Sequence, residues 1–89
     1  MSKVIKIIVL TSQQILVSEI EEVGSEIGEP DCKLINPFSM IKQKETDSYT
    51  LESWLDFTNQ NEMMIHSDSI LTIVDPTSEL LSKYFDMIK

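Results

Sequence analysis

The side chains best suited to chemistry lie together in one short polar stretch. His66, Ser67 and Asp68 separate two apolar runs, Met63–Ile65 and Ile70–Val74. Histidine is the side chain whose ordinary pKa lies nearest neutral pH, and the hydroxyl and carboxylate beside it can donate and accept hydrogen bonds. The stretch is therefore a candidate binding site, and an ordinary turn between two strands is the alternative interpretation.

Metal and nucleophilic chemistry have weaker support in the sequence. No cysteine or histidine pair has the spacing of a Cys-x-x-Cys or His-Glu-x-x-His metal motif. The single cysteine, Cys32, lies between Asp31 and Lys33. A reactive thiol needs a positively biased site and a base positioned beside it. We therefore predict no enzyme activity, no catalytic residue, no metal site and no cofactor.

The charge balance argues against a simple nucleic-acid-binding protein. The net charge is −8, and all seven basic side chains are lysines. Nucleic-acid binding usually needs a basic patch, and arginine supplies its bidentate and stacked contacts. A group of glutamates forms either a solvated face or a docking surface for a basic protein partner: Glu19, Glu21, Glu22, Glu26 and Glu29.

The length and composition fit one small domain that covers residues 1–89. No apolar run approaches the roughly 18 residues that a membrane-spanning helix needs, so we expect no membrane segment. The first residues lack the features of a signal peptide, and a single cysteine cannot form an intrachain disulfide. We therefore expect a cytoplasmic protein.

Apolar and β-branched runs predict a chain made mainly of strands. Residues 4–10 form a run that is apolar on both faces, and the polar break at 11–14 has the length of a hairpin turn. A return strand over 15–23 and a turn over 24–30 follow. The remaining predicted strands cover 32–41, with an irregularity at Asn36–Pro37, then 63–65 and 70–74.

The second half of the chain also holds one ambiguous segment and one helix. Residues 49–61 fit both helical spacing and strand alternation, and we favour a strand or irregular segment in which Trp54 packs against the core. Asp75 suits the N-cap and Pro76 the first position of a helix over about 76–88. One apolar stripe follows this helix: Leu80, Leu81, Tyr84, Phe85 and Ile88.

Short consecutive strands favour a small, bent, five-stranded antiparallel barrel with a C-terminal α-helix. At this point the chain resembles the Sm/LSm family of ring-forming, SH3-type barrels. That family ends with an Ile-Arg-Gly-Asp/Asn-x-Ile/Val pattern, and Ile65–Ile73 is the corresponding run here. Asp31–Ile35 is similar to the second part of the family's first motif. The extended middle segment and the terminal helix are similar to those of phage-encoded Sm-like proteins of marine origin.

The resemblance implies a site for single-stranded RNA at the pore side of a ring. The family's base-binding positions correspond here to Asp31, His66, Ser67 and Asp68. His66 and Ser67 replace the family's Arg-Gly pair, so the arginine plane that stacks on a base is absent. A histidine ring can stack on a base instead.

A ring is also expected on physical grounds. A small open barrel leaves two strand edges, and an exposed apolar edge invites pairing with another chain. Head-to-tail pairing of 63–65 in one copy with 70–74 in the next completes both edges in a homo-oligomer of about five to seven copies. The expected interface residues are Met63, Met64, Ile65, Ile70, Leu71, Thr72, Ile73 and Val74.

The sequence thus predicts a non-enzymatic ring, with single-stranded RNA as the first candidate ligand. The alternative is an acidic homo-oligomeric scaffold that binds a basic protein and no RNA.

Overall fold

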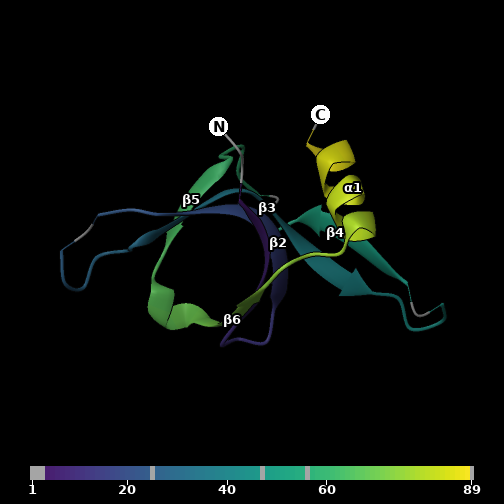
Figure 1. Cartoon of the computed structure of the whole chain (residues 1–89), viewed down its shortest axis with the longest axis horizontal. Coiled ribbons are helices and arrows are strands. Elements are labelled where there is room, and N and C mark those ends of the chain that lie inside the picture. The colour runs from purple at the N-terminus through teal and green to yellow at the C-terminus, as the bar shows by residue number, and fades with distance from the viewer. Residues whose placement is uncertain (1–3, 25, 47, 56, 89) are drawn as a thin grey trace.

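A computed structural model describes residues 4–24, 26–46, 48–55 and 57–88. Strands follow one another along the chain, and one helix comes after the last strand (Figure 1). The elements are β1 (Ile5–Leu10), β2 (Ile15–Glu22), β3 (Cys32–Lys42), β4 (Tyr49–Ser53), β5 (Glu62–Ile65), the 3-10 turn η1 (Ser67–Ser69), β6 (Ile70–Val74) and α1 (Ser78–Met87). Within the described ranges, no helix is long and apolar enough to cross a membrane.

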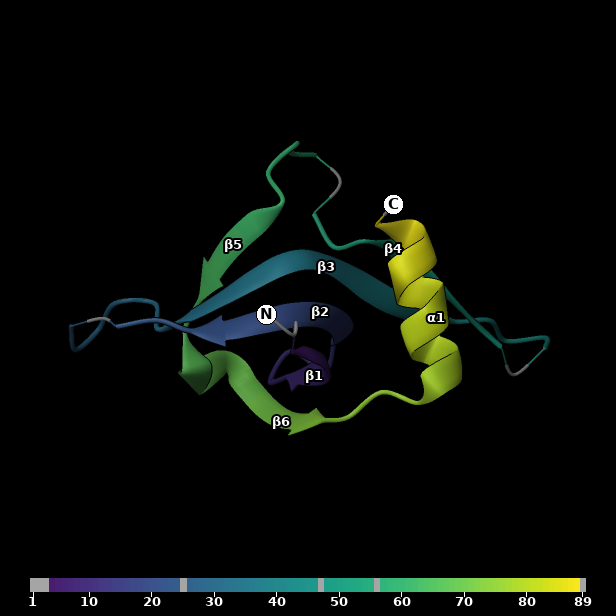
Figure 2. The same ribbon diagram turned by 45° about the horizontal axis from the view of Figure 1, so that its top comes forward.

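The strands form one antiparallel sheet in the order β4-β3-β2-β1-β6, and β5 pairs with the first half of β3 (Figure 2). The mainly β class, the antiparallel pairing and the C-terminal helix are therefore confirmed. Two finer features differ from the predicted architecture. Five strands follow one path and a sixth, β5, lies beside β3, and over the described residues the sheet does not close into a barrel. The sixth strand arises because the strand opposite β3 is interrupted at residues 54–61.

β3 bends at the level of this interruption. Asn36 has a φ of +54°, in the left-handed region that asparagine tolerates better than most residues. Pro37 follows it and has no N–H to donate to a ladder. Cys32–Ile35 pairs with β5, whereas Phe38–Lys42 pairs with β4. The predicted irregularity at Asn36–Pro37 is confirmed, and it divides β3 into halves with different partners.

β2 is irregular at the same level. The register of its pairing with β3 shifts between Val17 and Glu19, which places Ser18 opposite the bend. Ser18 is fully buried, and its hydroxyl oxygen lies 2.8 Å from the carbonyl oxygen of Glu19 and 3.1 Å from that of Ile35. The Ser18 hydroxyl therefore donates to backbone carbonyl groups at the point where the ladder is irregular. This satisfies the requirement that buried polar groups form hydrogen bonds.

Both faces of the sheet carry buried apolar side chains. The face beneath α1 contains Ile5, Val17, Phe38, Leu80 and Tyr84. The opposite, concave face contains Ile8, Leu10, Leu16 and Leu34, against which Trp54 packs. β1 contributes to both clusters, as its run of apolar residues, interrupted only by Lys6, predicts. The expected packing of Trp54 against the core is confirmed.

The helix begins later than predicted. Thr77 is the N-cap, and its hydroxyl accepts a hydrogen bond from the Leu80 N–H at 3.2 Å. The carboxylate of Asp75 forms an ion pair with Lys6 of β1 instead of capping the helix. The predicted N-cap at Asp75 and first helical position at Pro76 are therefore wrong, because a tertiary ion pair occupies the side chain that local sequence favours as a cap.

Tyr84 of α1 joins the helix to the bend in the sheet. It is fully buried, and its ring meets Phe38 edge to face with 5.8 Å between centroids. Its hydroxyl accepts from the Glu19 N–H at 3.2 Å and lies 3.0 Å from the carbonyl oxygens of both Ile35 and Asn36. Burial raises the pKa of the Tyr84 hydroxyl, so the group keeps the proton that it donates.

We expect Tyr84→Phe to lower the free energy of unfolding by about 1–3 kcal/mol, because it leaves the Glu19 N–H and buried carbonyl groups without their partner. Urea unfolding followed by Trp54 fluorescence measures the change. Tyr49→Phe is the matched control, since the half-buried Tyr49 ring lies 4.8 Å from the Lys83 ammonium and keeps that contact. The control is expected to change the same free energy by less than about 0.5 kcal/mol. Equal losses in both variants would contradict the role given to Tyr84.

Candidate functional site

Asp31 and Ser67 meet across 36 residues of chain. Asp31 directly precedes β3, and Ser67 is the first residue of η1. The two carboxylate oxygens of Asp31 accept from the Ser67 N–H and the Ser67 hydroxyl, each at 2.7 Å. The structure therefore brings together two residues that the sequence assigned to one site.

These contacts change the acidity of Asp31. Hydrogen bonds from the Ser67 hydroxyl and the Ser67 N–H hold the pKa of the Asp31 carboxyl below its ordinary value of 3.8. A hydrogen bond to the ionised form stabilises that form, which is the direction seen here. Asp31 is therefore ionised throughout the neutral range, and it fastens the loop before β3 to the turn after β5.

A cavity of about 260 Å³ opens beside this contact. It lies between the loop that joins β2 to β3 and the turn that joins β5 to β6. Its lining residues are Glu26, Ile27, Gly28, Glu29, Asp31, His66, Ser67 and Asp68. All four predicted RNA-binding residues, Asp31, His66, Ser67 and Asp68, thus line one cavity, although what the cavity binds stays a prediction.

The cavity is strongly acidic. Carboxylates line it at Glu26, Glu29, Asp31 and Asp68, and none of its described lining residues is a lysine. The nearest lysine along β3, Lys33, has its ammonium 3.2 Å from Glu62 and 3.6 Å from Glu21. These partners raise the pKa of Lys33 and engage its charge. A phosphate that entered the cavity would therefore meet like charge without a compensating cation.

The described residues form no site suited to metal binding or to a nucleophilic thiol. Among them, no group of three or more histidine, cysteine, aspartate or glutamate side chains could hold a metal ion. Cys32 is buried, and desolvation raises the pKa of its thiol. A buried thiol with a raised pKa is a weak nucleophile at neutral pH.

The two outer strands form the second notable feature. Among the described residues, β5 pairs only with β3 and β6 only with β1, so the far edge of each strand is open (Figure 2). β6 exposes its apolar side chains to an unusual degree: Leu71 is 67%, Ile73 44% and Val74 47% exposed. On β5, Met64 is 47% exposed. These strands contain all the predicted interface residues.

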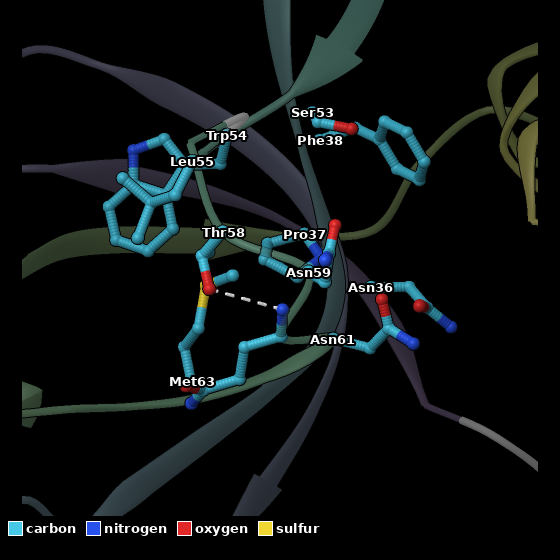
Figure 3. A pocket seen from close by; sticks show the side chains of 11 residues that line it. Asn36, Pro37, Phe38, Ser53, Trp54, Leu55, Thr58, Asn59, Asn61 and Met63 are labelled. Atoms are coloured by element: carbon cyan, nitrogen blue, oxygen red, sulfur yellow. Dashed lines mark hydrogen bonds between the residues drawn. The ribbon is translucent and has the colours of Figure 1, made fainter.

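A second cavity, which the sequence did not predict, lies between the bend of β3 and the segment that separates β4 from β5 (Figure 3). Its amide side chains have no spacing typical of a known motif. These amides come together because the backbone of Asn36 and Pro37 is hydrogen-bonded to that of Asn61 and Trp54.

Stability should fall in acid as Asp31 is protonated. The pKa of Asp31 is lower in the folded protein than in the unfolded chain. The carboxylate therefore stabilises the fold fully at pH values above the unfolded pKa, and this stabilisation is lost as the pH falls through the folded pKa. Carbon NMR of the Asp31 carboxyl group should give a pKa below 3.8. Ser67→Ala should return that pKa part of the way toward 3.8, because it removes the hydroxyl donor, which is the largest cause of the shift, and leaves the backbone N–H donor in place. Ser69→Ala is the control, since it removes a hydroxyl of the same turn that donates to the His66 carbonyl oxygen instead. An unchanged Asp31 pKa in Ser67→Ala would contradict the assignment.

Comparison with known proteins places the chain in a family. None of the curated proteins compared with the chain matches it. The model of one family matches residues 3–89, which is nearly the whole chain. The chain therefore belongs to the family described as "Family of unknown function (DUF6561)".

Proposed function

We propose that this protein is a non-enzymatic subunit of a closed homo-oligomeric ring of the Sm-like kind, which acts as an acidic scaffold for a basic protein partner. The observation that carries the proposal is the pair of open, apolar edges on β5 and β6. Each edge is incomplete in a single copy, and each is the natural partner of the other.

β6 lacks two of the devices that keep edge strands apart, charge and proline, although its ladder with β1 shifts register between Thr72 and Ile70. Monomeric sheet proteins protect their edges with proline, lysine, inward-pointing charge or bulges. β6 reads Ile-Leu-Thr-Ile-Val, with no charged residue and no proline. β5 reads Glu-Met-Met-Ile, and its one charged side chain, Glu62, pairs with Lys33 of its own chain. Both strands can therefore add a neighbour without burying an unpaired charge.

Head-to-tail pairing of β5 with β6 favours a closed assembly. The two edges differ, so a contact between them is heterologous and repeats from copy to copy. When the rotation between copies closes, every β5 and every β6 gains a backbone partner. The burial of Leu71, Ile73 and Met64 that this pairing brings adds hydrophobic stabilisation to the backbone hydrogen bonds.

A scaffold fits the acidic cavity better than RNA binding does. Both carboxylate oxygens of Asp31 already accept hydrogen bonds from Ser67, so polar groups expected to recognise a base bind each other. Four carboxylates line the cavity, and every copy adds a net charge of −8. A ring repeats this cavity around its axis, which favours a multivalent, positively charged protein segment over a phosphate backbone.

The assembly is tested by light scattering and native mass spectrometry at micromolar concentration. We expect one species with about five to seven times the 10.2 kDa mass of the chain. Leu71→Lys combined with Ile73→Lys should convert it to monomer, because lysines on an edge strand oppose pairing. Met87→Lys is the control: it places a lysine on a half-exposed apolar position of α1, outside β5 and β6, and should leave the assembly intact.

Two results would contradict the ring. A wild-type protein of monomer mass shows that the edges do not pair. A continuous distribution of larger masses shows that the contact does not close.

The choice between scaffold and RNA is tested by fluorescence anisotropy at about 50 and 200 mM salt. A lysine-rich peptide of about ten residues should bind, and more weakly at the higher salt, because ion pairs are screened. A uridine- or adenine-rich oligonucleotide should not bind at either salt concentration, and a glutamate-rich peptide is the negative control. Oligonucleotide binding that weakens in His66→Ala would instead support the RNA site.

A further inference from the structure

The segment between β4 and β5 forms a loop closed at its base by two backbone hydrogen bonds. The Trp54 N–H donates to the Pro37 carbonyl oxygen at 3.2 Å, and the Asn36 N–H donates to the Asn61 carbonyl oxygen at 2.7 Å. Both bonds go to the two residues that form the bend of β3. The segment of residues 54–61 thus leaves the sheet and returns to it at one place, as a compact surface loop does.

This loop and the bend enclose a cavity of about 220 Å³ (Figure 3). Asn36 and Asn61 lie together on one side of it, and Trp54 and Leu55 lie on the other. Its volume is below the roughly 300 Å³ at which cavities for drug-sized ligands begin, so it suits a single ring with its substituents.

The lining is rich in groups that both donate and accept hydrogen bonds. Amides project from Asn36, Asn59, Gln60 and Asn61, and Thr58 adds a hydroxyl. Gln60 uses its amide to donate to the Glu62 carbonyl oxygen. Within the part of the chain that the structure describes, the side-chain amides of Asn36, Asn59 and Asn61 have no hydrogen-bond partner in the protein. They are free to meet a ligand.

Apolar rings stand beside these amides. Trp54 is half-buried and packs on the core with one part of its ring system, while its indole N–H donates to Gln14 at 3.4 Å. Trp54 and Phe38 line the same cavity as the free amides. Together they offer a ligand an apolar surface and a set of hydrogen-bond partners at its rim.

The cavity differs from the rest of the surface in its charge. One quarter of the residues of this protein are charged, yet none of the described lining residues of this cavity is. A charged ligand would lose its hydration here without gaining a counter-charge. The described lining therefore favours an uncharged ligand, in contrast to the acidic cavity at Asp31.

We propose that this cavity binds one neutral saccharide unit, with its ring against the apolar side and its hydroxyls on the amides of Asn36, Asn59 and Asn61. A pyranose ring combines an apolar face of C–H groups with vicinal hydroxyls that donate and accept, which matches both halves of the lining. A nucleotide brings a phosphate that the net charge of −8 repels. This site does not depend on the assembly of β5 with β6.

The site is tested by proton–nitrogen NMR of the labelled full chain during titration with methyl glycosides of glucose, galactose, mannose and N-acetylglucosamine. We expect saturable shifts, for at least one of these probes, confined to residues 36–38 and 53–63. A ligand of about a dozen heavy atoms at ordinary ligand efficiency binds with a Kd on the order of 1 mM. Asn59→Ala and Asn61→Ala should each weaken binding about five- to tenfold, because each removes hydrogen bonds to the ligand.

Gln43→Ala is the matched control. It truncates an exposed amide in the loop between β3 and β4, where Gln43 donates to Thr50 at 3.3 Å, and it should bind the glycoside as wild type does. Glucuronate should bind more weakly than methyl glucoside. Three results would overturn the proposal: no saturable shift with any neutral glycoside at about 50 mM, wild-type affinity in both the Asn59→Ala and the Asn61→Ala variant, or tighter binding of adenosine or uridine than of every glycoside.

Discussion

The bend of β3 at Asn36–Pro37 is the constraint from which the other features follow. A strand that turns through a left-handed asparagine and a proline cannot keep one straight partner, because the ladder loses a donor and changes direction. The strand opposite therefore breaks into β4 and β5, with residues 54–61 displaced from the sheet. That displacement creates the amide-lined cavity, and it leaves β5 as a short separate strand with an open edge.

The bend also explains why the helix lies where it does. An irregular ladder leaves backbone groups at Glu19, Ile35 and Asn36 that need partners inside the protein. Ser18 and Tyr84 supply them with buried hydroxyls. Because Tyr84 must reach these groups, α1 covers the sheet of its own chain, and the apolar stripe of the helix is used in the core. The helix thus leaves the edges of β5 and β6 open, and a backbone partner from another copy can pair with them.

The sequence predicted the parts of this fold that depend on local patterns. Runs of mostly apolar, β-branched residues located β1 and β6, and the Asn36–Pro37 pair located the bend. Asp31 and Ser67, which the sequence assigned to one site, are in contact, and what that site binds stays a prediction.

The features that sequence reasoning missed depend on partners far along the chain. Asp75 was expected to cap the helix, but Lys6 of β1 binds its carboxylate, and Thr77 caps the helix instead. The amides at Asn59 and Asn61 have no periodicity, and only their position opposite Asn36 makes them a site. The net charge of −8 predicts a surface that is negative as a whole. The fold was needed to show that one cavity is acidic and that the described lining of the other carries no charge.

The central claim is that the sheet of one copy is incomplete and that other copies complete it at β5 and β6. Amide hydrogen exchange, measured at several protein concentrations across the assembly range, tests this claim most directly. The claim predicts that protection of the amides in Glu62–Ile65 and Ile70–Val74 rises with protein concentration, while amides inside β1 and β2 stay protected throughout. Rapid exchange along both edges at every concentration would contradict it.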